Sequence, residues 1–261
     1  IYGCLVGSEM CIRDSRFPNS LDGNQSLRLR YNIHAMRNYA FYNEGAKRTG
    51  PFPQVRHEGS LEIKCKTTPT RGKYMDVHHS REWSTWTGQA PSSKQDIIAK
   101  VHYADDATGT LQNWEMSYNS TPILPVKSYK YNELGPMLKH GRIKQGMIEL
   151  TASRKGVSNI QLNTIHPVTT LYTLIERFQS DNAVATTVDY LDDLTMLRPG
   201  LAITTLPDDT IEIEGVPTKL RGYALVGPAI LPLFIWMDER SNVIAVIGRN
   251  VAYTLIEAEN V

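Results

Sequence analysis

The chain has 261 residues, with 28 lysines and arginines against 27 aspartates and glutamates. This near-balance argues against a nucleic-acid partner, which is typically bound by a strongly basic surface. The longest apolar run, residues 223–237, is interrupted by Pro228 and Pro232 and is shorter than the roughly 20 residues that a membrane-spanning helix needs. We therefore expect no nucleic-acid partner and no transmembrane span, and the length allows one large β domain or two small domains.

The first fifteen residues differ from the rest of the chain. Residues 5–15, LVGSEMCIRDS, resemble one reading frame of a transposase sequencing adaptor. The resemblance implies that residues 1–15 are an artefact, that natural sequence begins near Arg16, and that the true N-terminus and any signal peptide are missing. A natural segment with one apolar face is the alternative. Without residues 1–15 the charges are 27 basic and 25 acidic, and Cys65 is the one cysteine left, so no internal disulfide is possible.

Most of the remaining sequence predicts short β-strands. Segments in which apolar and polar residues alternate with period two indicate strands with one buried face. Segments that are polar or rich in glycine and proline indicate irregular structure. Strands are expected at residues 27–33, 61–65, 74–77, 82–86, 97–103, 111–118 and 143–150, and loops or turns at 16–24, 44–56, 105–109 and around Gly135, Pro136 and Gly141.

One segment breaks the alternation. Apolar residues at positions 168, 171, 172, 175 and 178 follow the 3.6-residue period, and Pro167 suits a first helical turn, so a single helix is predicted near 167–179. Beyond it, we expect strands at residues 201–206, 210–214, 220–226 and 251–257, with a break at 207–209.

A hairpin within residues 223–246, YALVGPAILPLFIWMDERSNVIAV, is expected to be central to the fold. Its apolar runs 231–237 and 243–247 flank a short polar break, which is typical of a β-hairpin. Trp236 should be buried, because Phe234 and Met237 leave no polar face to expose. The whole pattern predicts one β-rich domain at residues 16–261: a large curved antiparallel sheet or open barrel of ten or more strands with one packed α-helix.

No residue is assigned to a catalytic, cofactor-binding or metal site. His78 and His79 are adjacent and would point to opposite faces of a strand, so they cannot easily bind one ion. Cys65, between Lys64 and Lys66, is interpreted as strand packing. The chain has no Gly-x-Ser-x-Gly nucleophile elbow and no phosphate-binding glycine loop. We expect no cofactor in this segment.

Two other patterns suggest chemistry and are set aside. Residues 103–106 (YADD) and 190–193 (YLDD) resemble the Tyr-x-Asp-Asp signature of reverse transcriptases, whose carboxylates hold magnesium. That chemistry needs a third converging carboxylate, and the family's other blocks are absent. Trp83, Trp86 and Trp114 could form a stacking platform for sugars, but Trp83 and Trp86 would face opposite sides of a strand, so we expect at least one of them to pack in the core.

Residues 206–247 carry a family resemblance. Within them YALVG (223–227) and PLFIWMDE (232–239) are similar to the end of the β domain that precedes the metal-dependent barrel in secreted bacterial amidohydrolases. The motif consists of packing residues, so it speaks to fold more than to function. The resemblance implies a non-catalytic, extracytoplasmic accessory module, with a possible catalytic domain and its metal ligands downstream of Val261.

The same hairpin also resembles free-standing periplasmic β proteins, in which a curved antiparallel sheet wraps a helix and a Trp-x-Asp strand lies near the C-terminus. This resemblance implies an alternative: a periplasmic β protein that binds a lipid, peptide or envelope component in the concavity of its sheet. A hydrolase with its site inside the visible chain is a third hypothesis. The small-molecule or lipid ligand and the oligomeric state stay open.

Overall fold

The computed structural model describes residues 26–36, 55–68, 72–83, 93–122, 137–153, 159–179, 186–213, 215–228, 230–248 and 251–260. The predictions for the adaptor-like segment 5–15, the segment 16–24, most of the loop 44–56, and Trp86 lie outside these residues.

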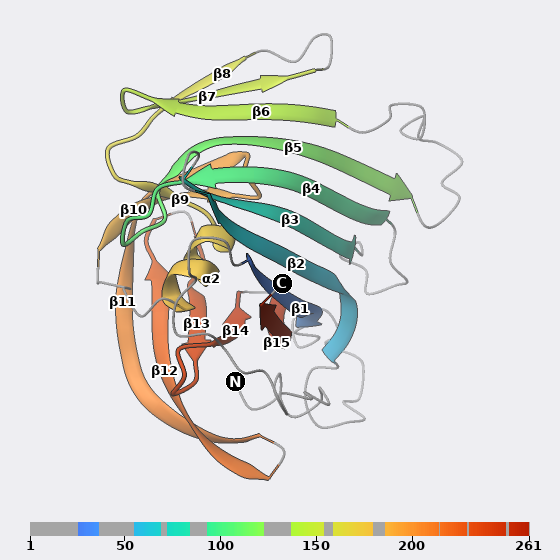
Figure 1. Ribbon diagram of the computed structural model, residues 1–261, viewed down its shortest axis with the longest axis vertical. Helices are drawn as coiled ribbons and strands as arrows, with labels where there is room; N and C mark the ends of the chain where they lie inside the picture. Colours follow the sequence, from blue (N-terminus) through green and yellow to red (C-terminus); the bar gives the residue numbers. More distant parts are fainter. Residues whose placement is uncertain are drawn as a thin grey trace, which may run out of the picture.

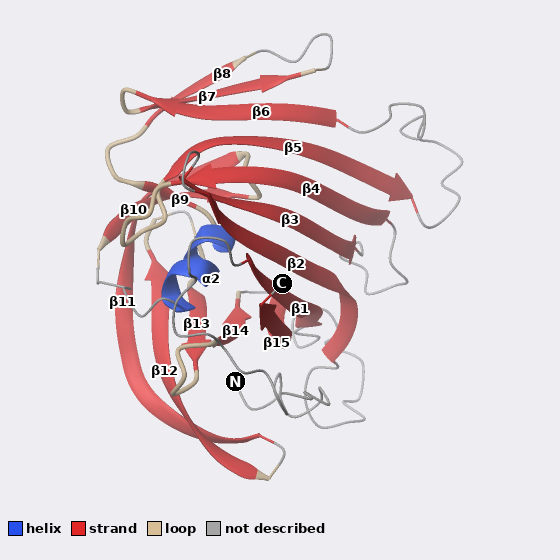
Figure 2. Ribbon diagram, in the orientation of Figure 1, coloured by secondary structure: helices blue, strands red, loops and turns tan. Residues whose placement is uncertain are grey.

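One sheet of 15 strands forms the framework of the described residues (Figures 1 and 2). Every pairing between neighbouring strands is antiparallel except the parallel pairing of the ninth and tenth strands. The prediction of a large curved antiparallel sheet is confirmed. The strands are β1 (Ser26–Met36), β2 (Val55–Thr68), β3 (Gly72–Trp83), β4 (Ser93–Tyr103), β5 (Leu111–Pro122), β6 (Met137–Lys144), β7 (Met147–Ala152), β8 (Ile160–Asn163), β9 (Val168–Thr169), β10 (Thr187–Asp192), β11 (Met196–Ile213), β12 (Val216–Val226), β13 (Leu233–Met237), β14 (Val243–Ile247) and β15 (Val251–Asn260).

The order of the strands in the sheet is β8-β7-β6-β5-β4-β3-β2-β1-β15-β14-β13-β12-β11-β10-β9. The chain therefore runs outward from β1 to β8, crosses to β9 at the opposite end of the sheet, and returns strand by strand to β15. Because β8 and β9 form two separate ends, the sheet is open and not a closed barrel. The first and last strands are paired neighbours, with Tyr31 opposite Leu255.

The crossover between β8 and β9 is tied down by one carboxylate. Asp189 of β10 is buried, and its Oδ2 accepts hydrogen bonds from the backbone N–H groups of Ile165 (3.0 Å) and His166 (3.2 Å). Its Oδ1 accepts a third bond from the N–H of Gly200, 2.9 Å away. A single side chain thus holds the crossover against the β10–β11 hairpin.

The helix α2 (Leu171–Gln179) lies inside the curve of the sheet (Figure 1). The prediction of a helix near 167–179 is confirmed, but its start at Pro167 is wrong. Val168 and Thr169 are β-branched and pair with β10 instead. The carbonyl of Thr170 accepts the first helical hydrogen bond, from Leu174 N, and Thr173 Oγ1 accepts a bond from the backbone N–H of Thr170.

The buried apolar side chains form two clusters on opposite faces of the sheet. The larger one joins the inner face of the sheet to the apolar side of α2. The smaller one lies on the other face of β11–β15 and includes Trp236. Ile235 and Met237 belong to the larger cluster, so the strand alternates between two cores. Burial of Trp236 is confirmed, and the reason is the second core, to which Phe234 also contributes while Met237 belongs to the other cluster.

Several predicted boundaries between residues 74 and 150 are wrong. The segments 74–77 and 82–86 were expected as two strands, whereas β3 is one strand paired with β4 along its whole length. The segment 143–150 was expected as one strand, but it contains the turn from β6 to β7. Gln145 and Gly146 both have positive φ there (51° and 72°), as a tight hairpin turn requires.

Two further corrections concern a loop and a break. Gly141 was expected in a loop and lies within β6, where it pairs with Trp114 of β5. A break was expected at residues 207–209, but β11 is continuous. The register against β12 shifts between Leu206 and Asp209, so the segment is a bulge that lets the strand bend without ending.

Candidate functional site

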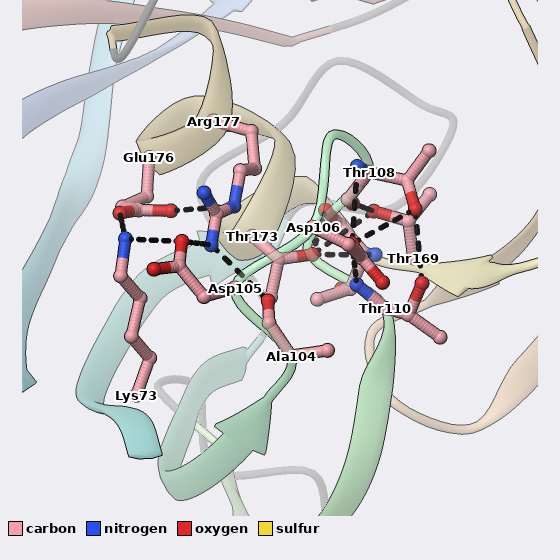
Figure 3. A network of polar contacts seen from close by, with 11 residues as sticks. Lys73, Ala104, Asp105, Asp106, Thr108, Thr110, Thr169, Thr173, Glu176 and Arg177 are labelled. Carbon is pink, nitrogen blue, oxygen red and sulfur yellow. Dashed lines mark hydrogen bonds and ion pairs between the residues drawn. The ribbon is translucent and has the colours of Figure 1, made fainter. Parts of the chain in front are cut away.

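A partly buried polar network joins α2 to the sheet (Figure 3). Glu176 and Arg177 of α2 are buried, and the Arg177 guanidinium lies 2.8 Å from the Asp105 carboxylate in the β4–β5 turn. Lys73 of β3 lies 2.9 Å from Asp105 and 3.4 Å from Glu176. Hydrogen bonds from Lys73 and Arg177 lower the pKa of Asp105, and the bond from Lys73 has the larger effect. The network therefore links three parts of the fold through charge.

The β4–β5 turn is itself ordered by hydrogen bonds. Asp106 Oδ1 accepts bonds from the backbone N–H groups of Thr108 (3.1 Å) and Thr110 (2.9 Å). Thr169 Oγ1 donates to the carbonyl of Thr108, 3.0 Å away, and lies 2.9 Å from Thr173 Oγ1. These contacts, visible in Figure 3, hold the turn against the start of α2. The oxygen atoms named here are already hydrogen-bonded to other groups of the protein. We therefore assign these side chains a positioning role.

A second polar cluster lies on the inner face of the sheet. His79 of β3 is 2% exposed, and its Nδ1 lies 3.1 Å from the Tyr172 hydroxyl of α2. The His79 ring also meets the ring of Tyr253 of β15 edge-on, with centroids 5.8 Å apart. Burial lowers the pKa of His79 to about 4 and raises the pKa of Tyr172 well above its usual value. Arg81 and Asp193 form an ion pair of 3.9 Å beside it.

A groove of about 490 Å³ crosses the opposite, outward-facing side of β2–β6. Its floor has a small residue, Ser117, directly between two larger ones: Ile98 on β4 and Leu138 on β6 are its partners in register. Both apolar side chains are about half exposed, at 58% and 46%. The hollow therefore results from the small side chain of Ser117 between the larger side chains of its two cross-strand partners. Its charged lining residues are Glu62, Lys64, Asp76, Lys100, Glu115 and Lys139, with His78 and His140.

The charges in the groove are of both signs and partly paired. Lys64 lies 2.8 Å from Glu62, which also contacts Arg28 at 3.1 Å. His140 lies 3.7 Å from Glu115. The Arg28–Glu62 and His140–Glu115 pairs join neighbouring strands, and the side chains of all three pairs are at least partly exposed, so the pairs contribute little to stability. Their mixture leaves the groove without one sign of charge, while most of its exposed lining surface is apolar.

The structure places the two YxDD patterns in different surroundings. The first, residues 103–106, enters the β4–β5 turn described above. The second, residues 190–193, ends β10, and burial raises the pKa of Asp192. Within the described ranges, no group of three or more histidines, cysteines, aspartates or glutamates is placed to hold a metal ion. The two aspartate pairs are not brought together with a third carboxylate.

The structure also shows where the candidate histidines, cysteine and tryptophans of the sequence lie. His78 is exposed and His79 is buried, so the prediction that they face opposite sides is confirmed. Cys65 is buried on the inner face, and this burial raises the pKa of its thiol. Trp114 is buried as well and donates from Nε1 to the carbonyl of Leu194, 3.2 Å away, so it does not belong to a surface platform. Nothing is described for the side chain of Trp83.

Sequence reasoning missed the cluster around His79. With a metal site set aside, His79 was predicted to be a surface or structural residue, and Tyr172 and Tyr253 were predicted only as parts of a helix and a strand. One signal was present: a buried-face histidine in an alternating strand needs a hydrogen-bond partner. That partner is 93 residues away in the sequence.

The described residues define a β protein with an open, barrel-like sheet around the short helix α2. No family model matches the chain, and no curated protein matches it. Among solved structures it is similar to a beta-barrel-like protein of domain of unknown function DUF1849 from Brucella abortus, with a TM-score of 0.53 and 7% sequence identity. The match covers 92% of this chain and 99% of that chain. At this identity, the likeness shows the fold alone. No helix in the described part of the chain has the length and apolar character to cross a membrane.

Proposed function

We propose that this chain is a non-catalytic β protein that acts outside the cytoplasm by binding an extended peptide in the groove across β2–β6. The observation that carries the proposal is the row Ile98, Ser117, Leu138, in which two half-exposed apolar side chains flank a hollow. A peptide side chain fits the hollow, and the charges of both signs around it suit the polar backbone and neighbouring side chains of such a segment.

A peptide suits the groove better than an acyl chain does. Lipid chains need an enclosed apolar cavity, whereas this groove is open and more than half of its lining residues can carry a charge. The concavity of the sheet, where a ligand was first expected, is occupied by α2, whose apolar residues are packed against the sheet. We therefore propose that the ligand binds on the outward face.

The proposal of a non-catalytic role has its own support. The buried groups with strongly displaced pKa values, among them His79, Tyr103 and Tyr172, line none of the groove. A catalytic acid or base must contact its substrate. A screen of the purified chain against ester and amide substrates, with and without zinc, tests this role. Turnover that a chelator abolishes would contradict it.

Peptide binding is tested with a phage library of random extended heptapeptides. Ser117→Trp fills the hollow, and Asn113→Trp is the matched control, because Asn113 is exposed on the same face of β5 outside the groove. We expect a consensus with a central apolar residue that is enriched on the wild type and on the Asn113 variant but not on the Ser117 variant. No enrichment, or equal binding by both variants, rejects the proposal. If the wild type and the Asn113 variant bind dodecanoate and only the Ser117 variant does not, the ligand of the groove is a lipid and not a peptide.

The location outside the cytoplasm, and the role as leading module of a secreted amidohydrolase, rest on the resemblance of residues 206–247. The neighbouring solved structure gives the amidohydrolase link no support, since its description concerns a β-barrel-like protein alone. Sequencing the source DNA tests both ideas. A signal peptide upstream of Arg16 supports export. A downstream barrel with a His-x-His strand supports the accessory role, and a stop codon directly after Val261 excludes it.

A further inference from the structure

We propose that His79 is an acid-sensitive latch, which holds α2 in the concavity of the sheet and releases it when the imidazole ring gains a proton. The proposal is independent of the peptide groove, which lies on the opposite face. It begins from the position of the ring, which contacts Tyr172 on the helix and Tyr253 on β15. Two strands, β2 and β1, separate β3 from β15 in the sheet. One buried ring therefore bridges the curve of the sheet and fastens the helix to it.

The ring is suited only to the neutral state. Nδ1 is hydrogen-bonded to the Tyr172 hydroxyl, whereas Nε2 is buried and has no hydrogen-bond partner among the described residues. A neutral imidazole needs one donor and one acceptor, but an imidazolium presents two N–H donors and a charge. Protonation would place that second donor and the charge where no acceptor is available, which is costly in a protein interior.

The charged and titratable groups around the ring do not offer that acceptor. Tyr172 faces it from α2 and Tyr253 from β15, and the pKa of each is raised by burial, so both stay neutral. Arg81 lies on the same strand, and a second cation would be unfavourable beside it. The negative charge of Asp193, in the β10–β11 turn, raises the pKa of His79, but this carboxylate is already in the ion pair with Arg81. Tyr190 and Asp192 act on the hydroxyl groups of Tyr172 and Tyr253 instead. His78 points to the other face.

The helix is the element that can move most easily. β3 and β15 are each hydrogen-bonded to strands on both sides, whereas α2 makes no ladder bonds with the sheet. A nine-residue helix has little stability of its own in water. Its other anchors include the Lys73–Glu176 pair, the threonine contacts at its start and the Asp105–Arg177 pair, and this last pair remains charged in mild acid because the pKa of Asp105 is lowered. Displacing the Tyr172 end of α2 is therefore the least costly way to give a protonated His79 access to water. It would also uncover the apolar inner face of the sheet.

Hydrogen exchange tests the latch. Amide protection of residues 171–179, corrected for the intrinsic effect of pH, is measured from pH 7.5 to pH 4.5, with residues 26–36 of β1 as an internal reference. Burial lowers the pKa of His79 to about 4, so we expect opening of α2 to increase roughly 10- to 100-fold, while β1 stays protected. Loss of protection in α2 and β1 together, or no pH effect on α2, would overturn the proposal.

Two adjacent histidines give a matched pair of variants. His79→Gln cannot gain a proton but keeps a side chain able to bond the Tyr172 hydroxyl, and it should abolish the pH effect. His78→Gln changes the exposed neighbour and should retain the effect in full. Equal behaviour of the two variants rejects the latch. If His79→Gln does not fold, an NMR titration of the wild type decides: a His79 pKa of 6 or above contradicts the proposal, and a value below 5 supports it.

Discussion

The indole ring of Trp114 covers Gly141, the residue opposite it on the neighbouring strand. A Cβ atom at position 141 would overlap two carbons of that ring. The ring is 1% exposed, and its N–H reaches the carbonyl of Leu194, so β5, β6 and the β10–β11 turn meet at one side chain. Glycine at position 141 is therefore needed for close approach and not for a turn.

Gly141→Ala should destabilise the protein by roughly 1–3 kcal/mol, because the added methyl group must displace a buried ring. Gly248→Ala is the control, since its nearest neighbour to a new Cβ is an ordinary 3.5 Å away. Urea unfolding followed by tryptophan fluorescence measures both. Equal stability of the two variants would show that Trp114 can shift without cost.

Trp236→Ala should cost roughly 3–5 kcal/mol, because it empties the centre of the second core, on the face away from α2. Leu231→Ala, at a side chain that is about half exposed, should change stability by less than about 0.5 kcal/mol. Both values come from urea melting curves. A cost below about 1 kcal/mol for Trp236→Ala would mean that the hairpin contributes little to folding.

Arg177→Met should destabilise the protein by about 3 kcal/mol, because it leaves the buried Glu176 with Lys73 as its remaining cationic contact in Figure 3. Adding Glu176→Gln should recover part of the loss, since the uncompensated charge is then gone. The exposed Arg240 provides the control, and Arg240→Met should have little effect. Failure of the double variant to recover stability would assign the loss to packing and not to charge.

The free energy of unfolding should decrease as the pH falls from about 6.5 to 4. The pKa of His79 is about 4 in the folded protein and 6.5 when it is unfolded, so the unfolded state binds the proton first and acid favours unfolding. The full effect amounts to roughly 3 kcal/mol. Asp192 acts in the opposite direction, because its pKa is raised in the fold. The difference between wild type and His79→Gln isolates the histidine. Parallel pH curves for the two would contradict this prediction.

Much of the strand content could be predicted because one face of most strands meets solvent. β1 and β5 alternate between buried and polar residues, and both were predicted. β10 was missed, since four successive residues from Val188 to Leu191 are buried and the alternation disappears. Strands with two buried faces lack the alternation of apolar and polar residues on which strand prediction from sequence depends. The turn at Gln145 and Gly146 was missed for a different reason, because apolar residues on both sides continued the pattern across it.

The polar clusters could not be predicted, because their members are brought together by register and not by sequence spacing. Lys73 and Glu176 are 103 residues apart, and their contact depends on where α2 enters the concavity. The groove has the same origin. Ser117 is an ordinary strand residue, and it forms a hollow only because Ile98 and Leu138 are its partners.

The pairing of β1 with β15 has a consequence for how the protein is made. During synthesis β1 emerges before β15, and β2 can cover one of its edges, but its other partner, β15, emerges only after β2–β14 have been made. Until then, backbone donors and acceptors along residues 27–35 face outward and can pair with a strand from another molecule. Nascent or truncated chains that lack residues 251–260 should therefore associate in vivo, and a holding chaperone would be most needed in that interval.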